Sequence, residues 1–137
     1  MVVDTSALIA IVTQEDECLL FEDMILRAPT AVISAISIVE ATIVLNSKSK
    51  DFDQRQLDSA VAALQLDMRG VDLNQGELAR QAYLRYGRGR NPAGLNFGDC
   101  FAYALAKARD DVLLFKGDDF AQTDIVPAWR PGHTPTS

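Results

Sequence analysis

The chain contains few of the residues on which several common catalytic chemistries depend. Its 137 residues include a single histidine, His133, which lies in the C-terminal sequence PGHTPTS. A catalytic triad or a histidine general base would have to use that residue, which argues against both chemistries. The two cysteines, Cys18 and Cys100, are far apart and belong to no Cys-x-x-Cys or Cys/His cluster. They are typical of reduced core thiols, and their separation argues against a zinc site.

Long apolar runs and positive charge are also scarce. No segment approaches the roughly 20 apolar residues that span a bilayer, and Asp4 interrupts the apolar N-terminus at once. The net charge is -6, with 13 Lys and Arg against 19 Asp and Glu. This balance excludes a broad basic face for salt-driven binding to nucleic acid. We therefore expect a cytoplasmic protein in which any action on nucleic acid relies on local basic residues or on metal ions.

The composition that remains is that of one soluble globular domain. The chain is 48% hydrophobic and 23% charged, and its length allows a hydrophobic core without disulfides or structural metals. Short apolar segments alternate with amphipathic ones, which predicts an α/β fold of three layers, with helices on both faces of a mostly parallel sheet. We expect residues 1–126 to form a single domain, and residues 127–137, which include three prolines, to form a flexible tail.

The hydrophobic periodicity places the individual elements. Strands are predicted at residues 1–4, 31–34, 70–73 and 112–115, with an edge strand near Ile125. Helices are predicted at residues 7–12, 15–27, 35–47, 54–67, 75–86 and 97–109. The helix at 35–47 is apolar on nearly all sides, which predicts that it is buried.

Acidic residues follow the first and last predicted strands. Asp4 ends the first strand, and Asp118 and Asp119 come a few residues after the last. Ligands of open α/β sheets bind beyond the carboxyl ends of the strands, so these positions are candidates for a site. Asp99 lies in the first turn of its helix, where the helix dipole favours a carboxylate. Each aspartate is also well explained as a helix cap, so none is decisive alone.

Glu40 is harder to explain structurally. Its neighbours on the helix at i−4, i+3 and i+4 are Ile36, Ile43 and Val44. A carboxylate on such an apolar helix needs a cation, either a salt-bridge partner or a metal ion, unless its charged end reaches solvent at an edge. Clustered carboxylates repel one another unless a hard divalent cation such as Mg²⁺ or Mn²⁺ lies among them. Such a cation can activate water and stabilise charge on a phosphate.

Four blocks of sequence, taken in order, resemble the PIN-domain ribonucleases, and within them the VapC toxins of toxin–antitoxin pairs. The blocks are MVVDTSAL (residues 1–8), SAISIVEA (34–41), NPAGLNFGDCFAYA (91–104) and LLFKGDDF (113–120). The resemblance covers essentially the whole chain and implies a PIN-like domain. It also implies an endoribonuclease that cleaves RNA by metal-activated water, a cognate VapB-type antitoxin and a homodimer.

The resemblance also implies roles for the acidic residues. Asp4 and Asp99 match the positions that bind Mg²⁺, for which Mn²⁺ can substitute, and Glu40 completes the acidic pocket. A fourth acidic residue follows the last core strand. We choose Asp118 because it comes first after Gly117, while its neighbour Asp119 stays open as the alternative.

Substrate contacts are expected from polar and basic residues close to these acids. Thr5 and Ser6 follow Asp4, Lys116 precedes the acidic pair, and Arg88 and Arg90 lie in the loop before the Asp99 helix. A solvated surface or a helix cap explains any one of them equally well. The aromatic residues Tyr83, Tyr86 and Phe97 are candidates for stacking on bases, although such residues more often belong to a core or an interface.

Three other classes compete with a ribonuclease. The first is a non-catalytic PIN-like module that only binds a partner, against which the intact acidic set argues. The second is a phosphoacceptor receiver domain, which Lys116 fits, although Asp72 is the only nearby phosphoacceptor and no acidic pair follows the first strand. The third is a phosphatase with a nucleophilic Asp-x-Asp, which is disfavoured because Asp4 is followed by Thr5 and Ser6.

Overall fold

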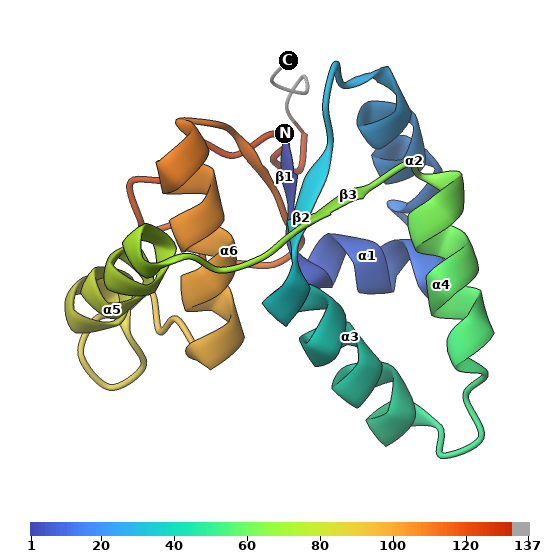
Figure 1. Ribbon diagram of the computed structural model, residues 1–137, viewed down its shortest axis with the longest axis horizontal. Coiled ribbons are helices and arrows are strands. Elements are labelled where there is room, and N and C mark those ends of the chain that lie inside the picture. Colours follow the sequence, from blue (N-terminus) through green and yellow to red (C-terminus); the bar gives the residue numbers. More distant parts are fainter. Residues whose placement is uncertain (133–137) are drawn as a thin grey trace.

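The computed structural model describes residues 1–132 and has a parallel sheet at its centre (Figure 1). Its strands are β1 (Val2–Val3), β2 (Val32–Ser34), β3 (Asp67–Arg69) and β4 (Leu113–Leu114), in the order β3-β2-β1-β4. Its helices are α1 (Thr5–Val12), α2 (Cys18–Arg27), α3 (Ala35–Lys48), α4 (Gln54–Ala63), α5 (Leu73–Tyr86) and α6 (Phe97–Arg109). Every strand pair is parallel.

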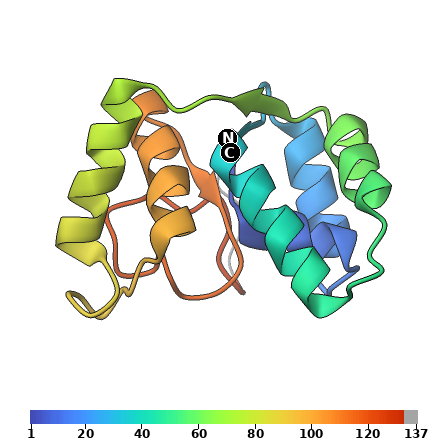
Figure 2. The same ribbon diagram turned by 60° about the horizontal axis from the view of Figure 1, so that its bottom comes forward.

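Alternate residues of the central strands bury opposite faces of the sheet. Val3, Ile33 and Leu114 pack with α1 to α4, whereas Val2, Val32 and Leu113 pack with α5 and α6. Figure 2 shows the two groups of helices on either side of the sheet. Burial on both faces explains why these short strands are continuously apolar. The predicted three-layer α/β/α architecture is confirmed.

Two predicted elements differ from the structure. The third strand lies at Asp67–Arg69 and not at the predicted residues 70–73. The prediction misplaced it because it is an edge strand whose side chains are all exposed. It is held by backbone pairing, with the amide of Asp67 donating to Ala31 at 2.9 Å, so no apolar pattern marks it. The prediction that the helix at 35–47 is buried is also wrong, since Val39 and Ile43 of α3 are largely exposed.

The segment after β4 partly packs onto the domain. In place of the edge strand predicted near Ile125, a single bridge joins Leu113 to Pro127. Ala128 is fully buried, and the ring of Trp129 meets Phe21 edge-on with centroids 5.2 Å apart. The first residues of the predicted tail therefore contribute to the core. The predicted tail also includes residues 133–137, among them His133, and these residues lie outside the described part of the chain.

The strand order determines where a site can form. The connections from β1 to β2 and from β2 to β3 move outward in one direction, and β4 then pairs on the other side of β1. The order reverses between β1 and β4, which is where open α/β sheets bind ligands at the carboxyl ends of their strands. Asp4 follows β1 directly, so it stands at this point. No helix within residues 1–132 has both the length and the apolar character needed to cross a membrane.

Candidate active site

Asp4 is a buried carboxylate that caps α1. One oxygen, Oδ2, accepts hydrogen bonds from the backbone amide of Ser6 at 3.0 Å and from its hydroxyl at 2.7 Å. The other oxygen, Oδ1, is buried and has no hydrogen-bond partner within the described residues. Burial raises the pKa of Asp4 to about 6 against the two Ser6 hydrogen bonds, and the charge of Glu40 adds to the rise. The capping interaction therefore involves only one of the two carboxylate oxygens of Asp4.

Asp99 lies in the first turn of α6, within a capping box formed with Asn96. Its Oδ2 accepts from the Asn96 amide at 3.0 Å, and its own amide donates to Oδ1 of Asn96 at 2.8 Å. Burial raises the pKa of Asp99 to about 8 despite the Asn96 hydrogen bond, and the charges of Asp4 and Asp119 raise it further. The structure thus brings Asp4 and Asp99 close enough for their charges to interact.

Glu40 reaches the site from α3 and lies against the first turn of α6. A methyl group on Gly98 would lie 2.6 Å from Oε1 of Glu40 and closer still to Oε2. The missing side chain of Gly98 therefore makes room for the carboxylate between Asp4 and α6. Sequence reasoning missed Gly98, whose only signal was its place directly before Asp99. Glu40 is only half-buried, so part of its charge is solvated.

The fourth acidic residue beside this cluster is Asp119. The Asp119 carboxylate lies close enough to Asp99 for its charge to raise the pKa of Asp99. Asp118 instead lines a separate groove with Phe115 and Trp129. The structure therefore favours Asp119, the alternative left open by the sequence, and the assignment of the fourth acid stays a prediction. Gly117, which precedes both residues, has φ of 100°, a conformation that favours glycine.

The donor set can be compared with the needs of a divalent cation. Within residues 1–132, no three His, Cys, Asp or Glu side chains converge as a ready-made metal-binding group. The chemistry nevertheless fits a hard cation, because all the donors are carboxylate oxygens and Asp4 Oδ1 is buried without a partner. A cation would also relieve the repulsion that raises the pKa values of Asp4 and Asp99.

The hydroxyls predicted to contact substrate are occupied within the protein. Thr5 Oγ1 donates to the carbonyl of Ser37 at 3.2 Å, which ties α1 to α3. Ser6 Oγ donates to Asp4 and accepts from the backbone amide of Lys116 at 2.9 Å, so it joins the ends of β1 and β4. Both hydroxyl groups therefore connect elements of the fold that border the site.

The predicted basic contacts fall into two groups. The ammonium group of Lys116 pairs with Glu15 at 2.5 Å and with Glu17 at 2.9 Å, so it is directed to the turn between α1 and α2. The helix predicted from residue 15 begins instead at Cys18, so Glu15 and Glu17 precede it. Arg88 and Arg90 lie on the exposed loop between α5 and α6, on the side of the first turn of α6.

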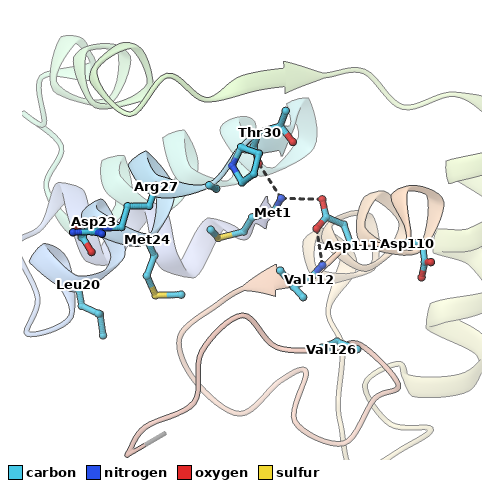
Figure 3. Close-up of a pocket in the computed structure, with 12 residues that line it drawn as sticks. Met1, Leu20, Asp23, Met24, Arg27, Thr30, Asp110, Asp111, Val112 and Val126 are labelled. Atoms are coloured by element: carbon cyan, nitrogen blue, oxygen red, sulfur yellow. Dashed lines mark hydrogen bonds and ion pairs between the residues drawn. The ribbon is translucent and has the colours of Figure 1, made fainter. Parts of the chain in front are cut away.

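A second cavity lies at the opposite end of the sheet. A groove of about 700 Å³ is lined by residues of α2 and by segments flanking β2 and β4, among them Met1, Thr30 and Asp111 (Figure 3). Two of the three acids that line it have cationic partners, since Asp111 accepts from the Met1 ammonium at 2.8 Å and Asp23 pairs with Arg27 at 2.8 Å. The acids that face one another among the described residues are those at the carboxyl ends of the strands, which is where the candidate site lies.

Comparison with known proteins identifies the family of the chain. The PIN domain family matches residues 1–126. The chain is 45% identical to a Ribonuclease VapC of Mycolicibacterium smegmatis over 126 residues, which cover 92% of this chain and 98% of the relative. It is 40% identical to Ribonuclease VapC30 of Mycobacterium tuberculosis over 131 residues, covering 96% and 100% of the two chains.

Solved structures agree on the fold. VapC20 of Mycobacterium tuberculosis, described as a sarcin-ricin loop cleaving toxin, matches with a TM-score of 0.70 at 18% identity, over 91% of this chain and 95% of that one. A toxin–antitoxin complex from Klebsiella pneumoniae matches with a TM-score of 0.66 at 18% identity, over 90% and 92%.

A parallel sheet with carboxylates at the β1–β4 switch point, matched along residues 1–126, defines a PIN-domain protein. Within that class, the chain belongs to the VapC ribonucleases, the toxin nucleases of toxin–antitoxin systems. The resemblance seen in the four sequence blocks and the predicted ribonuclease class are therefore confirmed.

Proposed function

We propose that this VapC-family ribonuclease is an Mg²⁺-dependent endoribonuclease, with Mn²⁺ able to substitute, and that it acts as a toxin in the cytoplasm. The observation that carries the proposal is the pairing of Asp4 and Asp99 at the switch point. Both carboxyl groups are buried, both have raised pKa values, and Asp4 keeps one oxygen free. Buried carboxylates with perturbed pKa values and no cationic partner are typical of functional sites.

Each acidic side chain has a distinct task in this proposal. Asp4 and Asp99 would hold the metal ion, which supplies activation of water and neutralisation of phosphate charge when it is bound. Glu40, which lies beside Asp4 and against Gly98, would accept a proton from the attacking water at its carboxylate. Asp119 would complete the donor set next to Asp99.

The partners belong to the same proposal. RNA is the substrate, and a VapB-type antitoxin is the inhibitor, in line with the toxin–antitoxin complex among the structural neighbours. A homodimer is supported by Val39 and Ile43, which are 56% and 60% exposed one turn apart on α3. Large exposed apolar side chains in such a pair are common where another copy of a chain packs.

The direct test is cleavage of RNA by the purified protein in Mg²⁺, in Mn²⁺ and in EDTA. We expect cleavage with either metal and none in EDTA, with new 5′ ends at defined positions by sequencing. Absence of cleavage under all conditions, with the protein folded and its RNA-binding intact, would favour the non-catalytic PIN-like module. Random 5′ ends would contradict a specific endoribonuclease.

A further inference from the structure

A cleft of about 600 Å³ lies between α5 and α6, beside the acidic site. Figures 1 and 2 both show these two helices side by side, apart from the rest of the helices. The lining of the cleft combines aromatic rings and guanidinium groups with apolar side chains: Arg80, Tyr83, Arg88, Leu95, Phe97 and Phe101. Neither Tyr83 nor Phe97 has a place in the hydrophobic core, because they are 45% and 72% exposed.

The charge of this region is opposite to that of the chain. Residues 78–98 include Arg80, Arg85, Arg88 and Arg90 and no Asp or Glu, whereas the whole chain has a net charge of -6. Arg80 pairs with Glu77 at the edge of this segment at 3.3 Å, and both side chains are exposed. Two of these arginines line the cleft, and the guanidinium of Arg90 lies 5.8 Å from the centre of the Tyr83 ring. This is the local basic surface that an acidic protein needs in order to hold a phosphate backbone.

The cleft is joined to the acidic site through the first turn of α6. Asn96 lines the cleft, and its amide donates to Asp99 at 3.0 Å. Phe97 follows Asn96 on the cleft side, with its ring centre 5.0 Å from that of Phe101. A group bound against Phe97 therefore lies next to a phosphodiester positioned at Asp99.

We propose that the α5–α6 cleft binds an unpaired nucleobase of single-stranded RNA, stacked on Phe97 and Tyr83, with the adjoining phosphate held by Arg80 and Arg88. An exposed ring backed by a second ring is a stacking platform, and arginines at its rim match the charge of the backbone. A base in a duplex is already stacked and cannot enter such a cleft. The inference rests on the proposed function for its substrate class and adds that the substrate is unpaired next to the cut.

The test measures RNA binding separately from cleavage. The probe is a fluorescein-labelled single-stranded oligouridine of about eight nucleotides in EDTA, with the dissociation constant measured by fluorescence anisotropy. We expect Phe97→Ala to weaken binding about tenfold, the size of one base–aromatic stack. Phe97→Trp should bind like the wild type and Phe97→Leu like Phe97→Ala, because a stacking surface and not apolar area is required.

Matched controls distinguish the cleft from general effects. Leu73→Ala removes a more exposed apolar side chain, 95% exposed, at the start of α5 but outside the cleft, and should leave binding unchanged. A probe whose nucleotides are abasic should bind wild type and Phe97→Ala equally. Arg88→Ala should weaken binding and reduce its dependence on salt.

Several results would overturn the inference. Binding by Phe97→Ala within twofold of the wild type would do so, as would full binding by Phe97→Leu or equal affinity for a duplex probe. If Phe97→Ala instead lowers the mass of the particle in sedimentation and leaves probe affinity unchanged, the cleft is a contact between copies of this chain. A wild type that binds the probe through Phe97 yet cleaves no RNA in Mg²⁺ or Mn²⁺ overturns only the proposed function.

Discussion

The carboxylates at the two ends of the sheet have opposite electrostatic environments. Near the amino ends of the strands, Asp111 pairs with the Met1 ammonium at 2.8 Å and with Arg109 at 3.5 Å. Burial tends to raise the pKa of Asp111, but these cations outweigh it and the pKa is lowered. At the carboxyl ends, Asp4 and Asp99 form no ion pair within residues 1–132, and their pKa values are raised to about 6 and about 8.

This difference in pairing distinguishes two kinds of carboxylate. Those with a cationic partner stabilise the fold, whereas those without one have no evident role in its stability. Asp124 belongs with the first kind, since it accepts from Tyr103 at 2.7 Å and from Lys107 at 3.0 Å, near the last turn of α6. The same helix carries Asp99 in its first turn, facing other acids. The acids near one end of the sheet have cationic partners within the protein, whereas Asp4 and Asp99 at the other end do not. The unpaired set is therefore best explained by a cation that binds there.

The largest expected effect is on cleavage when an acid of the unpaired set is neutralised. Asp99→Asn keeps the shape of the side chain but removes its charge, and we expect RNA cleavage in saturating Mg²⁺ to fall about 1000-fold or more, since a metal ion contributes several kcal/mol to such a reaction. Asp124→Asn is the matched control, as it neutralises a paired acid near the other end of α6 and should cleave within about twofold of wild type. Equal activity of the two variants would remove the distinction between the two ends.

The next effect is on stability as a function of pH. The folded-state pKa of Asp4, about 6, lies above the unfolded value of 3.8, so the folded protein binds this proton more tightly. Its contribution to stability is complete below the unfolded pKa and is lost as the pH rises through about 6. In EDTA, we expect the free energy of unfolding of wild type relative to Asp4→Asn to fall by about 2–3 kcal/mol between pH 3.5 and pH 8.

Urea denaturation at a series of pH values measures this difference, and the variant serves as the reference for the titrating groups that do not interact with Asp4. Addition of Mg²⁺ at pH 8 should restore much of the lost stability in the wild type, because a ligand that binds only the folded state stabilises it. A wild type that gains stability relative to Asp4→Asn as the pH rises would contradict the unpaired state of this carboxylate.

Asp118 and Asp119 allow the comparison to be sharpened within one turn of chain. The charge of Asp119 acts on Asp99, whereas Asp118 lines another groove. We expect Asp119→Asn to lower cleavage about tenfold and Asp118→Asn to change it by less than about twofold. Both side chains are exposed, so both variants should fold equally well by circular dichroism. The opposite ranking would restore the order inferred from the sequence.

Much of the fold could be predicted because the core strands carry a strong local signal. The segments around Val2, Val32 and Leu113 are short and apolar, as is typical of buried parallel strands, and the first two are followed directly by a helix cap. The third strand could not be placed, since an edge strand with exposed side chains is defined only by backbone pairing with β2. The exposure of Val39 could not be foreseen either, because apolar residues at a surface and in a core look alike in sequence.

The site could be predicted in part for a related reason. Asp4 and Asp99 are tied to element ends, which topology brings together at a switch point. The order of Asp118 and Asp119 depends on the direction of the chain after Gly117, which sequence spacing does not define. Lys116 pairs with Glu15 from a distant turn, and that contact is visible only in three dimensions. The role of Gly98 depends on the approach of another helix and has no local signature.

The smallest predicted effect concerns Gly98, which connects the unpaired acids to the packing around them. In Gly98→Ala the added methyl group would overlap the Glu40 carboxylate, the mobile end of a side chain, so Glu40 should move and the fold should persist. We expect cleavage to fall about fivefold, with stability unchanged or raised by up to about 1 kcal/mol, as alanine replaces glycine in a helix. Gly70→Ala is the control, because a methyl group there meets nothing within 4 Å.

A second comparison shows whether Gly98 acts through Glu40 or only through the helix. If the glycine serves to seat this carboxylate, Gly98→Ala should have no further effect on cleavage in a Glu40→Gln background, where the carboxylate's charge is already lost. Additive losses in the double variant would mean that Gly98 influences Asp99 or the metal directly. In that case the contact between α3 and α6 at Gly98 would not determine the position of Glu40. The effect of Gly98 on cleavage would then come from the first turn of α6 alone.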